Sequence, residues 1–529
     1  MKKTKRAVSV LLACLFIILN VCFAAFAAGP GAPPGGSGGP GGGGGGGSAS
    51  PEYTGATTIS ESITKSGTSY SSKTGSENAL LATGGTSTLS DITVSKTGDA
   101  SDEDADFYGT NAAVLAYNGA VLNISDADIT TAAAHANAVF AYGEGTVNLS
   151  DSTIKTTGNN SGAVMVTGGG TLVAENVSAE TSGNSSAPIR SDRGGGTLTV
   201  NGGSYTAGGK GSPAVYSTAD ITVNNAKLTS TSAEGIVIEG SNSVTFNNTT
   251  LTDTNTSLNG NSETYKNIFI YQSMSGDASE GTGTFTAKDS TITTNKGDTF
   301  FVTNTTAVIN LSNNHFTNTD ENGALLRIQA GKWGNSGSNG GAVTLNASNQ
   351  ALEGDVIADS ISTLAMTLAN SSTYQGTINA DNTAKSITLK LDVGSTLTLT
   401  GDSYITSLEN ESSDNANINL NGYTLYVDGE AITSTAYQAN SAQGTTVQTD
   451  AAAAQADTEK LGTGTVILIA AVAAAVVIAI VTAVVLITRK QKALAQGKAA
   501  GEPLQNHDGE VMQDPAGEPP QDPESGEEQ

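Results

Sequence analysis

Cysteine, histidine and tryptophan are scarce in this sequence, and each scarcity excludes a kind of chemistry. The 529 residues include two cysteines, three histidines and one tryptophan. Both cysteines, Cys14 and Cys22, lie in an apolar segment at the N-terminus. The rest of the chain therefore has no disulfide, no cysteine-based metal site and no thiol nucleophile. Its stability must come from another source, and we expect a continuous apolar core.

Basic residues are also few. The chain has 24 lysines and arginines against 50 aspartates and glutamates, which gives a net charge of −26. Between its two apolar ends the arginines are Arg190, Arg193 and Arg327. Nucleic-acid binding requires clustered cations that neutralise phosphates. We therefore exclude nucleic acid as a partner and expect the acidity to keep the surface well solvated.

The N-terminus has the three parts of a secretory signal peptide. Four basic residues precede an apolar run over 7–23, and residues 25–27 (Ala-Phe-Ala) supply the small-x-small site that signal peptidase accepts. We predict a removable signal peptide over 1–28. The alternatives are an uncleaved anchor helix and lipoprotein processing at Cys14.

A second apolar run lies near the C-terminus. It extends from about residue 465 to 488 without a charge, and a helix of this length spans the ~30 Å hydrocarbon core of a bilayer. Arg489 and Lys490 follow directly, and positive residues stay on the cytoplasmic side. We predict one transmembrane helix over 463–488 in the plasma membrane. The N-terminus would lie outside the cell and the C-terminus in the cytoplasm.

The segments around these ends are linkers by composition. A Gly/Pro-rich stretch behaves as a flexible leader, and an acidic tail with few apolar residues is expected to be disordered. The predicted order is signal peptide 1–28, flexible leader 29–52, ectodomain 53–430, an Ala/Thr/Gln-rich stalk 431–462, transmembrane helix 463–488 and an acidic cytoplasmic tail 489–529.

The ectodomain repeats a short strand pattern. Val114, Val139, Val164 and Ile189 are 25 residues apart, and each precedes an apolar-x-apolar strand, a turn residue and a further apolar position. The turn residues are of types that adopt a left-handed backbone or bond their own chain. They are Asp126, Asp151, Asn176, Gly202, Asn225, Asn248, Asp289 and Asn313.

Three short strands per turn of about 25 residues describe one coil of a parallel β-solenoid, whose stacked coils bury one continuous core. Within a strand, inward apolar and outward polar side chains alternate. A tandem array of β-sandwiches is the alternative, but its hairpins need antiparallel turns at irregular spacing. The sequence therefore predicts an all-β ectodomain.

This frame resembles that of right-handed parallel β-helix proteins with the pectate-lyase-like architecture. The Thr/Ser/Asn-rich exterior with few charges is similar to that of bacterial adhesin-like β-helix proteins. The resemblance covers roughly residues 53–429, with a less regular spacing after Leu352. It implies an adhesin-like or structural role at the cell surface, with a polysaccharide-acting lyase or glycosidase as the alternative.

The enzymatic alternative lacks a complete catalytic constellation. β-Helix enzymes on polysaccharides need acid–base carboxylates, or Ca²⁺ with a basic residue. Residues 318–320 (Asn-Thr-Asp) resemble one polygalacturonase motif, but the remaining motifs of that family do not follow. His135 and His315 belong to no recognisable Ser/His/Asp set. We leave activity open and take a binding or structural role as the default, since fold does not fix function.

Two insertions interrupt the repeat at the same corner, one coil apart, at 272–284 and 329–342. Insertions on one corner of a solenoid commonly form its binding face. We predict a candidate ligand patch there, with glycans or a host or neighbouring cell surface as partner. The alternatives are that the loops are tolerated surface growth and that the tryptophan folds back over the β-helix. The patch comprises Trp333, Lys332, Asp277 and Glu280.

An acidic loop at 98–111 is a candidate calcium site, because Ca²⁺ takes oxygen ligands. Its ligands would be Asp99, Asp102, Asp104 and Asp106. The loop lacks the glycine and glutamate of an EF-hand, and a solvated acidic loop is the alternative. We expect no other cofactor.

Overall fold

The structure is a computed structural model that describes residues 51–259 and 262–434. The predicted signal peptide, nearly all of the leader and stalk, the transmembrane helix and the tail lie outside the described residues. No helix within 51–259 and 262–434 is long and apolar enough to cross a membrane.

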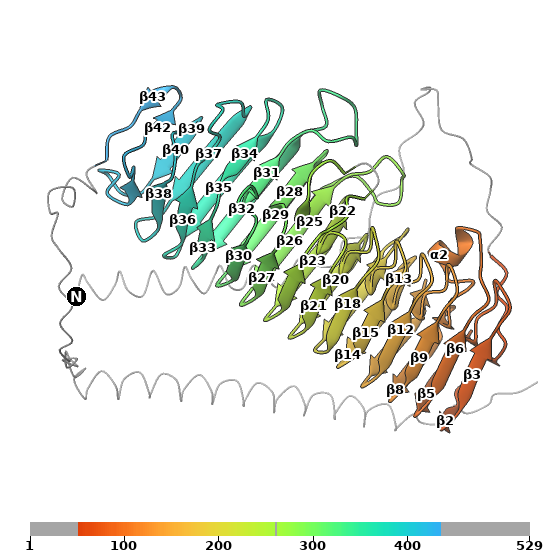
Figure 1. The fold of residues 1–529 in the computed structure, drawn as a ribbon. Coiled ribbons are helices and arrows are strands. Elements are labelled where there is room, and N and C mark those ends of the chain that lie inside the picture. The colour runs from red at the N-terminus through yellow and green to blue at the C-terminus, as the bar shows by residue number, and fades with distance from the viewer. Residues whose placement is uncertain (1–50, 260–261, 435–529) are drawn as a thin grey trace, which may run out of the picture. The chain divides into compact units, whose positions relative to one another are not determined.

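The described residues form a parallel β-helix in which each coil contributes one strand to each of three sheets (Figure 1). The first sheet has 12 strands in the described residues. In spatial order these are β1 (Thr58–Ile59), β4 (Leu80–Ala82), β7 (Val114–Ala116), β10 (Val139–Tyr142), β13 (Val164–Thr167), β16 (Ile189–Ser191), β19 (Val215–Ser217), β22 (Ile236–Glu239), β25 (Lys266–Tyr271), β28 (Asp298–Thr303), β31 (Leu326–Ile328) and β34 (Val356–Ala358).

The second sheet has 14 described strands and continues furthest along the stack. Its order is β2 (Thr64–Ser66), β5 (Thr86–Ser90), β8 (Val121–Ser125), β11 (Thr146–Ser150), β14 (Gly170–Glu175), β17 (Gly196–Asn201), β20 (Asp220–Asn224), β23 (Ser243–Asn247), β26 (Thr282–Lys288), β29 (Thr305–Ser312), β32 (Gly341–Ser348), β35 (Thr363–Ala369), β37 (Ser386–Leu391) and β40 (Ser407–Asn410).

The third sheet has 10 strands within the described residues. They are β3 (Ser69–Ser72), β6 (Thr93–Lys96), β9 (Asp128–Thr131), β12 (Thr153–Thr156), β15 (Ser178–Thr181), β18 (Ser204–Ala207), β21 (Lys227–Ser230), β24 (Thr250–Asp253), β27 (Thr291–Thr294) and β30 (His315–Asn318).

Neighbouring coils pair in register and in parallel, so that Val139 lies beside Val114 and Val164. The 25-residue spacing in the sequence is therefore the length of one coil. This confirms the predicted parallel β-helix and rules out the tandem β-sandwiches, whose sheets would be antiparallel.

The core follows from alternation along each strand. In β11 and β12 the side chains of Val147, Leu149 and Ile154 point inward and are at most 1% exposed, while Thr153 is exposed. Residues of this kind form one apolar cluster that extends from Ile59 to Leu425. Burial of this continuous stack supplies stability without disulfides.

The turn residues between the second and third sheets adopt a left-handed backbone. The φ angles are 53° at Asp126, 47° at Asp151, 53° at Asn176, 71° at Gly202, 55° at Asn225, 48° at Asn248, 53° at Asp289 and 54° at Asn313. Several of these side chains also bond along the stack. Asn176 donates from Nδ2 to Oδ1 of Asp151 over 2.7 Å. Asp and Asn at these turns therefore both allow the left-handed bend and form side-chain hydrogen bonds between neighbouring coils.

The C-terminal coils change their sheet arrangement and end in a closing strand. A four-stranded sheet of β33 (Ala351–Glu353), β36 (Thr373–Gly376), β38 (Thr396–Leu399) and β41 (Ile418–Asn419) follows the third sheet. A three-stranded sheet contains β39 (Ser403–Ile405), β42 (Leu425–Val427) and β43 (Glu430–Ala431). Strand β43 pairs antiparallel to β42 and so covers an edge that would otherwise be open to pairing.

Candidate functional site

Two insertion loops project from the corner between the first and second sheets. The first insertion loop, 272–281, joins β25 to β26, and the second insertion loop, 329–340, joins β31 to β32. Strands β26 and β32 both pair with β29, so one coil separates the loops. In that intervening coil, Asn304 alone connects β28 to β29, with a φ of 54°. The insertions therefore add about ten residues each to a corner that one residue can turn.

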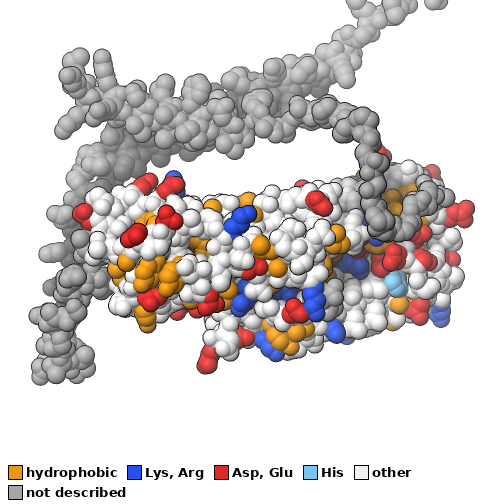
Figure 2. Space-filling model, turned by 90° about the horizontal axis from the view of Figure 1, so that it is seen from above, with side chains coloured by type: hydrophobic (Ala, Val, Ile, Leu, Met, Phe, Trp, Pro, Cys, Tyr) orange, Lys and Arg blue, Asp and Glu red, His pale blue; other side chains and the backbone are white. Residues whose placement is uncertain are grey.

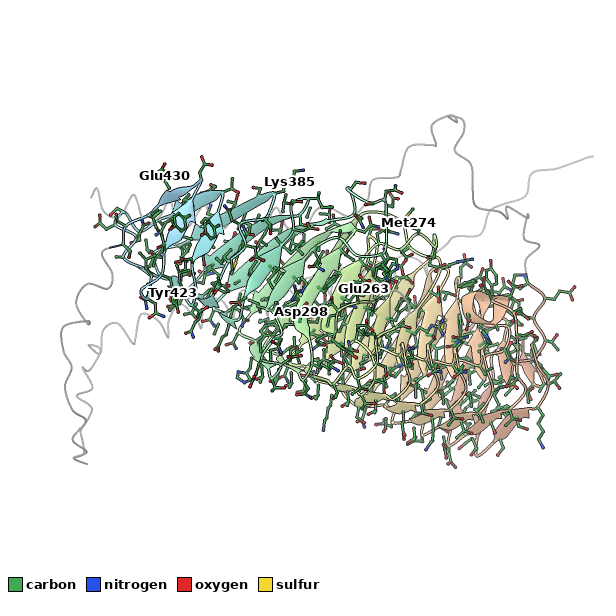
Figure 3. The ribbon with its side chains drawn as sticks, turned by 45° about the horizontal axis from the view of Figure 1, so that its top comes forward. Glu263, Met274, Asp298, Lys385, Tyr423 and Glu430 are labelled. Carbon is green, nitrogen blue, oxygen red and sulfur yellow. The ribbon has the colours of Figure 1, made fainter. Side chains whose placement is uncertain are left out.

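A groove of about 730 Å³ lies along this corner. Its floor is a row of residues at the first or second position of successive strands of the second sheet. These are the register partners Thr282, Thr306, Ala342 and Thr363. The first loop contributes Met274 and Glu280, and the second contributes Asn335 and Ser338. At the far end lies Lys385, which precedes β37. Figure 3 shows Met274 and Lys385 along the same edge of the β-helix.

Two buried amides shape the loops from within. The Nδ2 of Asn339 donates to the carbonyl oxygens of Gly331 (2.8 Å) and Trp333 (2.9 Å). The Nε2 of Gln272 donates to the carbonyl oxygens of Ser273 (3.2 Å) and Ala278 (3.3 Å). Each loop therefore has an internal hydrogen-bonded brace, which restricts its conformations.

A buried carboxylate anchors the start of the first insertion loop. Glu239, 1% exposed at the end of β22, accepts hydrogen bonds from the hydroxyls of Tyr216 (2.7 Å), Tyr271 (2.9 Å) and Ser273. Burial, together with the neighbouring carboxylate, raises the pKa of both tyrosines well above 10. They therefore keep their protons, and Glu239 has three hydroxyl donors for its charge.

The tip of the same loop is held by Arg193. Its Nε donates to Oδ1 of Asp277 over 2.5 Å, and its guanidinium lies 3.8 Å from the centre of the Phe107 ring. Phe107 belongs to α2 (Asp104–Tyr108), a five-residue helix within the acidic loop. Arg193 thus links the acidic loop to the first insertion loop across the outer face of the first sheet.

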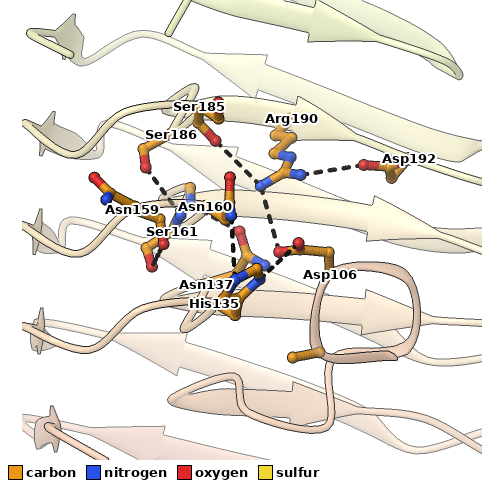
Figure 4. A network of polar contacts seen from close by, with 12 residues as sticks. Asp106, His135, Asn137, Asn159, Asn160, Ser161, Ser185, Ser186, Arg190 and Asp192 are labelled. Carbon is orange, nitrogen blue, oxygen red and sulfur yellow. Dashed lines mark hydrogen bonds and ion pairs between the residues drawn. The ribbon is translucent and has the colours of Figure 1, made fainter. Parts of the chain in front are cut away.

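A charged network lies beside α2 of the acidic loop (Figure 4). Arg190 donates to Oδ2 of Asp192 over 3.2 Å, and its other terminal nitrogen lies 3.8 Å from Oδ1 of Asp106. Asp106 also contacts Nδ1 of His135 at 2.8 Å. Burial raises the pKa of Asp192 to about 6 and Asp277 adds to this, although Arg190 opposes the shift. Asp192 is therefore a carboxylate that titrates near neutral pH.

The structure separates the four residues of the predicted patch. Glu280 lines the groove, whereas Asp277 is paired with Arg193 and faces the first sheet. Lys332 lies opposite neither of them, because its Nζ contacts Glu263 at 2.8 Å. Trp333 is half-buried, with its ring centre 5.4 Å from that of Phe269 and 5.1 Å from that of Tyr271. It therefore folds back over the outer face of the first sheet, as the alternative interpretation held.

The four aspartates of the acidic loop also have different surroundings. Asp99 accepts a hydrogen bond from the backbone N–H of Ala134 (2.8 Å), and Asp102 accepts one from the backbone N–H of Ala105 (3.1 Å). Asp104 is exposed to solvent, and Asp106 belongs to the charged network around Arg190. Within the described ranges, no three His, Cys, Asp or Glu side chains are placed to hold a metal ion. Asp99 and Asp102 therefore hold the backbone of the loop, whereas Asp106 contacts His135 and lies near Arg190.

Comparison with known proteins gives no relative. The chain matches no family model, no curated protein and no solved structure. Its architecture is a parallel β-helix by sheet topology.

The sequence reasoning missed the network around Arg190 and Arg193. A signal for it was present, because these are two of the three arginines in the ectodomain and are only three residues apart. It also missed Glu239, which ends an otherwise apolar strand, Ile-Val-Ile-Glu. A carboxylate closing such a strand must find hydrogen-bond donors or remain in water.

Proposed function

We propose that this chain is an adhesin-like cell-surface protein whose β-helix presents one specialised binding patch, the corner that carries the two insertion loops. One observation supports this most strongly: the first loop is fixed at its tip by Arg193 and at its start by Glu239. A loop that is merely tolerated needs no such anchors, because added length costs little. Binding loops are commonly held by a rigid scaffold.

The proposed location at the cell surface rests on the two apolar segments predicted near the ends of the chain. A signal peptide over 1–28 exports the protein, and a helix over 463–488 retains it in the plasma membrane. The partner would be a glycan or a neighbouring cell surface. Most of the surface visible in Figure 2 is neither charged nor hydrophobic, so on that face adhesion through general charge or apolar contact is disfavoured.

The test is to display the full chain on cells and trim both loops. Residues 272–281 and 329–340 are each replaced by a single asparagine, as at Asn304 in the intervening coil. We expect the trimmed protein to reach the surface and lose adhesion to glycan-coated beads and neighbouring cells. The control shortens 411–417, a loop in the last coils, and should adhere normally. Full adhesion by the trimmed protein would contradict the proposal.

A polysaccharide-acting enzyme is the second candidate. The observation that favours it is the network in which Arg190 connects Asp192 with Asp106 and His135. A carboxylate with a pKa of about 6 can serve as a general acid or base near neutral pH. The 318–320 motif gives no such support, because Asn318 and Asp320 bond the backbone of Gly297 (2.9 and 2.7 Å). Release of reducing sugar by the wild type but not by Asp192→Asn would favour the enzyme, whereas release by both proteins would contradict the role of Asp192.

A further inference from the structure

The groove beside the insertion loops is elongated along the axis of the β-helix. Its floor residues Thr282, Thr306, Ala342 and Thr363 are register partners on adjacent strands, so the row is parallel to the axis of the β-helix. With Lys385 beside the next strand, the groove spans five strands. At the strand spacing this is about 19 Å. A ligand that fills the groove is therefore extended and lies along the stack of coils.

The groove is almost neutral. Its lining contains one carboxylate, Glu280, and one amine, Lys385, at opposite ends, and the other polar groups are hydroxyls, amides and backbone. Met274 adds an apolar side chain that is 68% exposed. A single amine cannot neutralise a polyanion. Nucleic acids and acidic polymers are therefore poor ligands for this surface.

An extended peptide is also a poor ligand. Peptides that bind to sheets usually add a strand at an open edge, where main-chain groups are unpaired. The floor strands β29, β32 and β35 are each paired on both sides. The groove therefore offers side-chain hydroxyls and amides, which suit a ligand with many hydroxyl groups of its own.

We propose that this groove binds a linear, uncharged polysaccharide whose chain lies parallel to the axis of the β-helix. This inference rests on the proposed function and names the ligand class of its patch. The floor repeats at the strand spacing and three of its four residues are threonines, so a longer chain meets further hydroxyl groups until the groove is full. Because the loops are anchored and braced, little conformational entropy is lost when the ligand binds.

The test measures binding of soluble oligosaccharides to the folded protein by calorimetry. The probes are uncharged β-glucan, xylan, mannan and chitin oligomers from disaccharide to hexasaccharide, with oligogalacturonate as the acidic probe. We expect affinity for at least one uncharged series to rise with length and then level off, and oligogalacturonate to bind weakly or not at all. The proposal is overturned if no uncharged series binds, or if only the acidic probe does.

A blocking variant locates the site. Ala342 is exposed at the middle of the floor, so Ala342→Trp fills the groove without disturbing the core. We expect its affinity for the bound oligosaccharide to fall about tenfold or more. The matched control is Thr199→Trp, at an outward position of the same sheet away from the groove, which should bind normally. Equal binding by Ala342→Trp and the wild type would place the ligand elsewhere.

Adhesion by cells that display Ala342→Trp separates this inference from the proposed function. Loss of both oligosaccharide binding and adhesion supports both. Loss of oligosaccharide binding with normal adhesion supports the glycan site and contradicts its adhesive role. Loss of adhesion with normal oligosaccharide binding contradicts the site and leaves the adhesive role standing.

Discussion

Arg193 and Asp277 form an ion pair of 2.5 Å across 84 residues of sequence. The arginine follows β16 and the aspartate lies in the first insertion loop, so the pair spans several coils of the stack. The same guanidinium also stacks on Phe107. One side chain therefore fixes two loops that arise at different corners of the β-helix, and this coupling can be tested directly.

Replacing Arg193 with alanine should loosen the first insertion loop with little effect on global stability. The arginine side chain is 46% exposed, and exposed ion pairs contribute roughly 0–1 kcal/mol. We expect hydrogen-exchange protection over 272–281 to fall by up to about fivefold, since local opening is controlled by local contacts. The control is Lys155→Ala, which breaks the exposed pair with Glu180 and should leave the loop unchanged. Unaltered protection in Arg193→Ala would show that Arg193 does not hold the loop.

Two adjacent residues of β12 test the inward and outward alternation. Ile154 is 1% exposed and lies in the core, whereas Thr153 is exposed. We expect Ile154→Asp to reduce the free energy of unfolding by about 3 kcal/mol or more, because it buries an unpaired carboxylate. Thr153→Asp should change it by about 0.5 kcal/mol or less. Equal changes in thermal midpoint would contradict this register.

The repeat could be predicted from the sequence because its causes are local. Alternation decides that Ile154 is buried, and the need for a left-handed bend restricts residue 151 to types such as Asp. Both causes act within one coil and recur in the next. The register of the coils up to about residue 352 follows from that recurrence, whereas the changed sheet arrangement of the later coils does not.

The loop contacts could not be predicted because their partners are distant in sequence. Whether Trp333 points to solvent or folds back depends on Phe269 and Tyr271, which precede it by more than sixty residues. One signal was available in the sequence: residues 268–271 of β25 and 300–302 of β28 are consecutive apolar residues rather than alternating ones. Such runs indicate that both faces of a sheet are covered.

Asp192→Asn should alter how stability depends on pH. Burial raises the pKa of Asp192 from its ordinary value of 3.8 to about 6 in the folded chain. Its protonated form therefore stabilises the fold below about pH 4, and this contribution is lost as the pH rises through 6. Asparagine does not titrate, so from pH 4 to pH 7 the stability of the variant should increase relative to the wild type by up to about 3 kcal/mol. Urea unfolding at several pH values measures this, and a difference that is constant with pH would contradict it.

Asp253→Asn should stabilise the protein at neutral pH. Asp253 ends β24 and is 0% exposed, and no side chain of the described residues donates a hydrogen bond to its carboxylate. Burial and the nearby Glu234 raise its pKa well above 3.8, although the backbone N–H groups of Asn255 and Thr254 lower it, so ionising Asp253 in the folded chain costs free energy. Asparagine removes that cost because its amide group carries no charge. We expect a gain of about 1–3 kcal/mol at pH 7, shrinking towards acid pH where the aspartate is protonated. Thermal unfolding at pH 7 and pH 4 measures both, and a lower midpoint for the variant at pH 7 would mean that the fold requires the charged carboxylate.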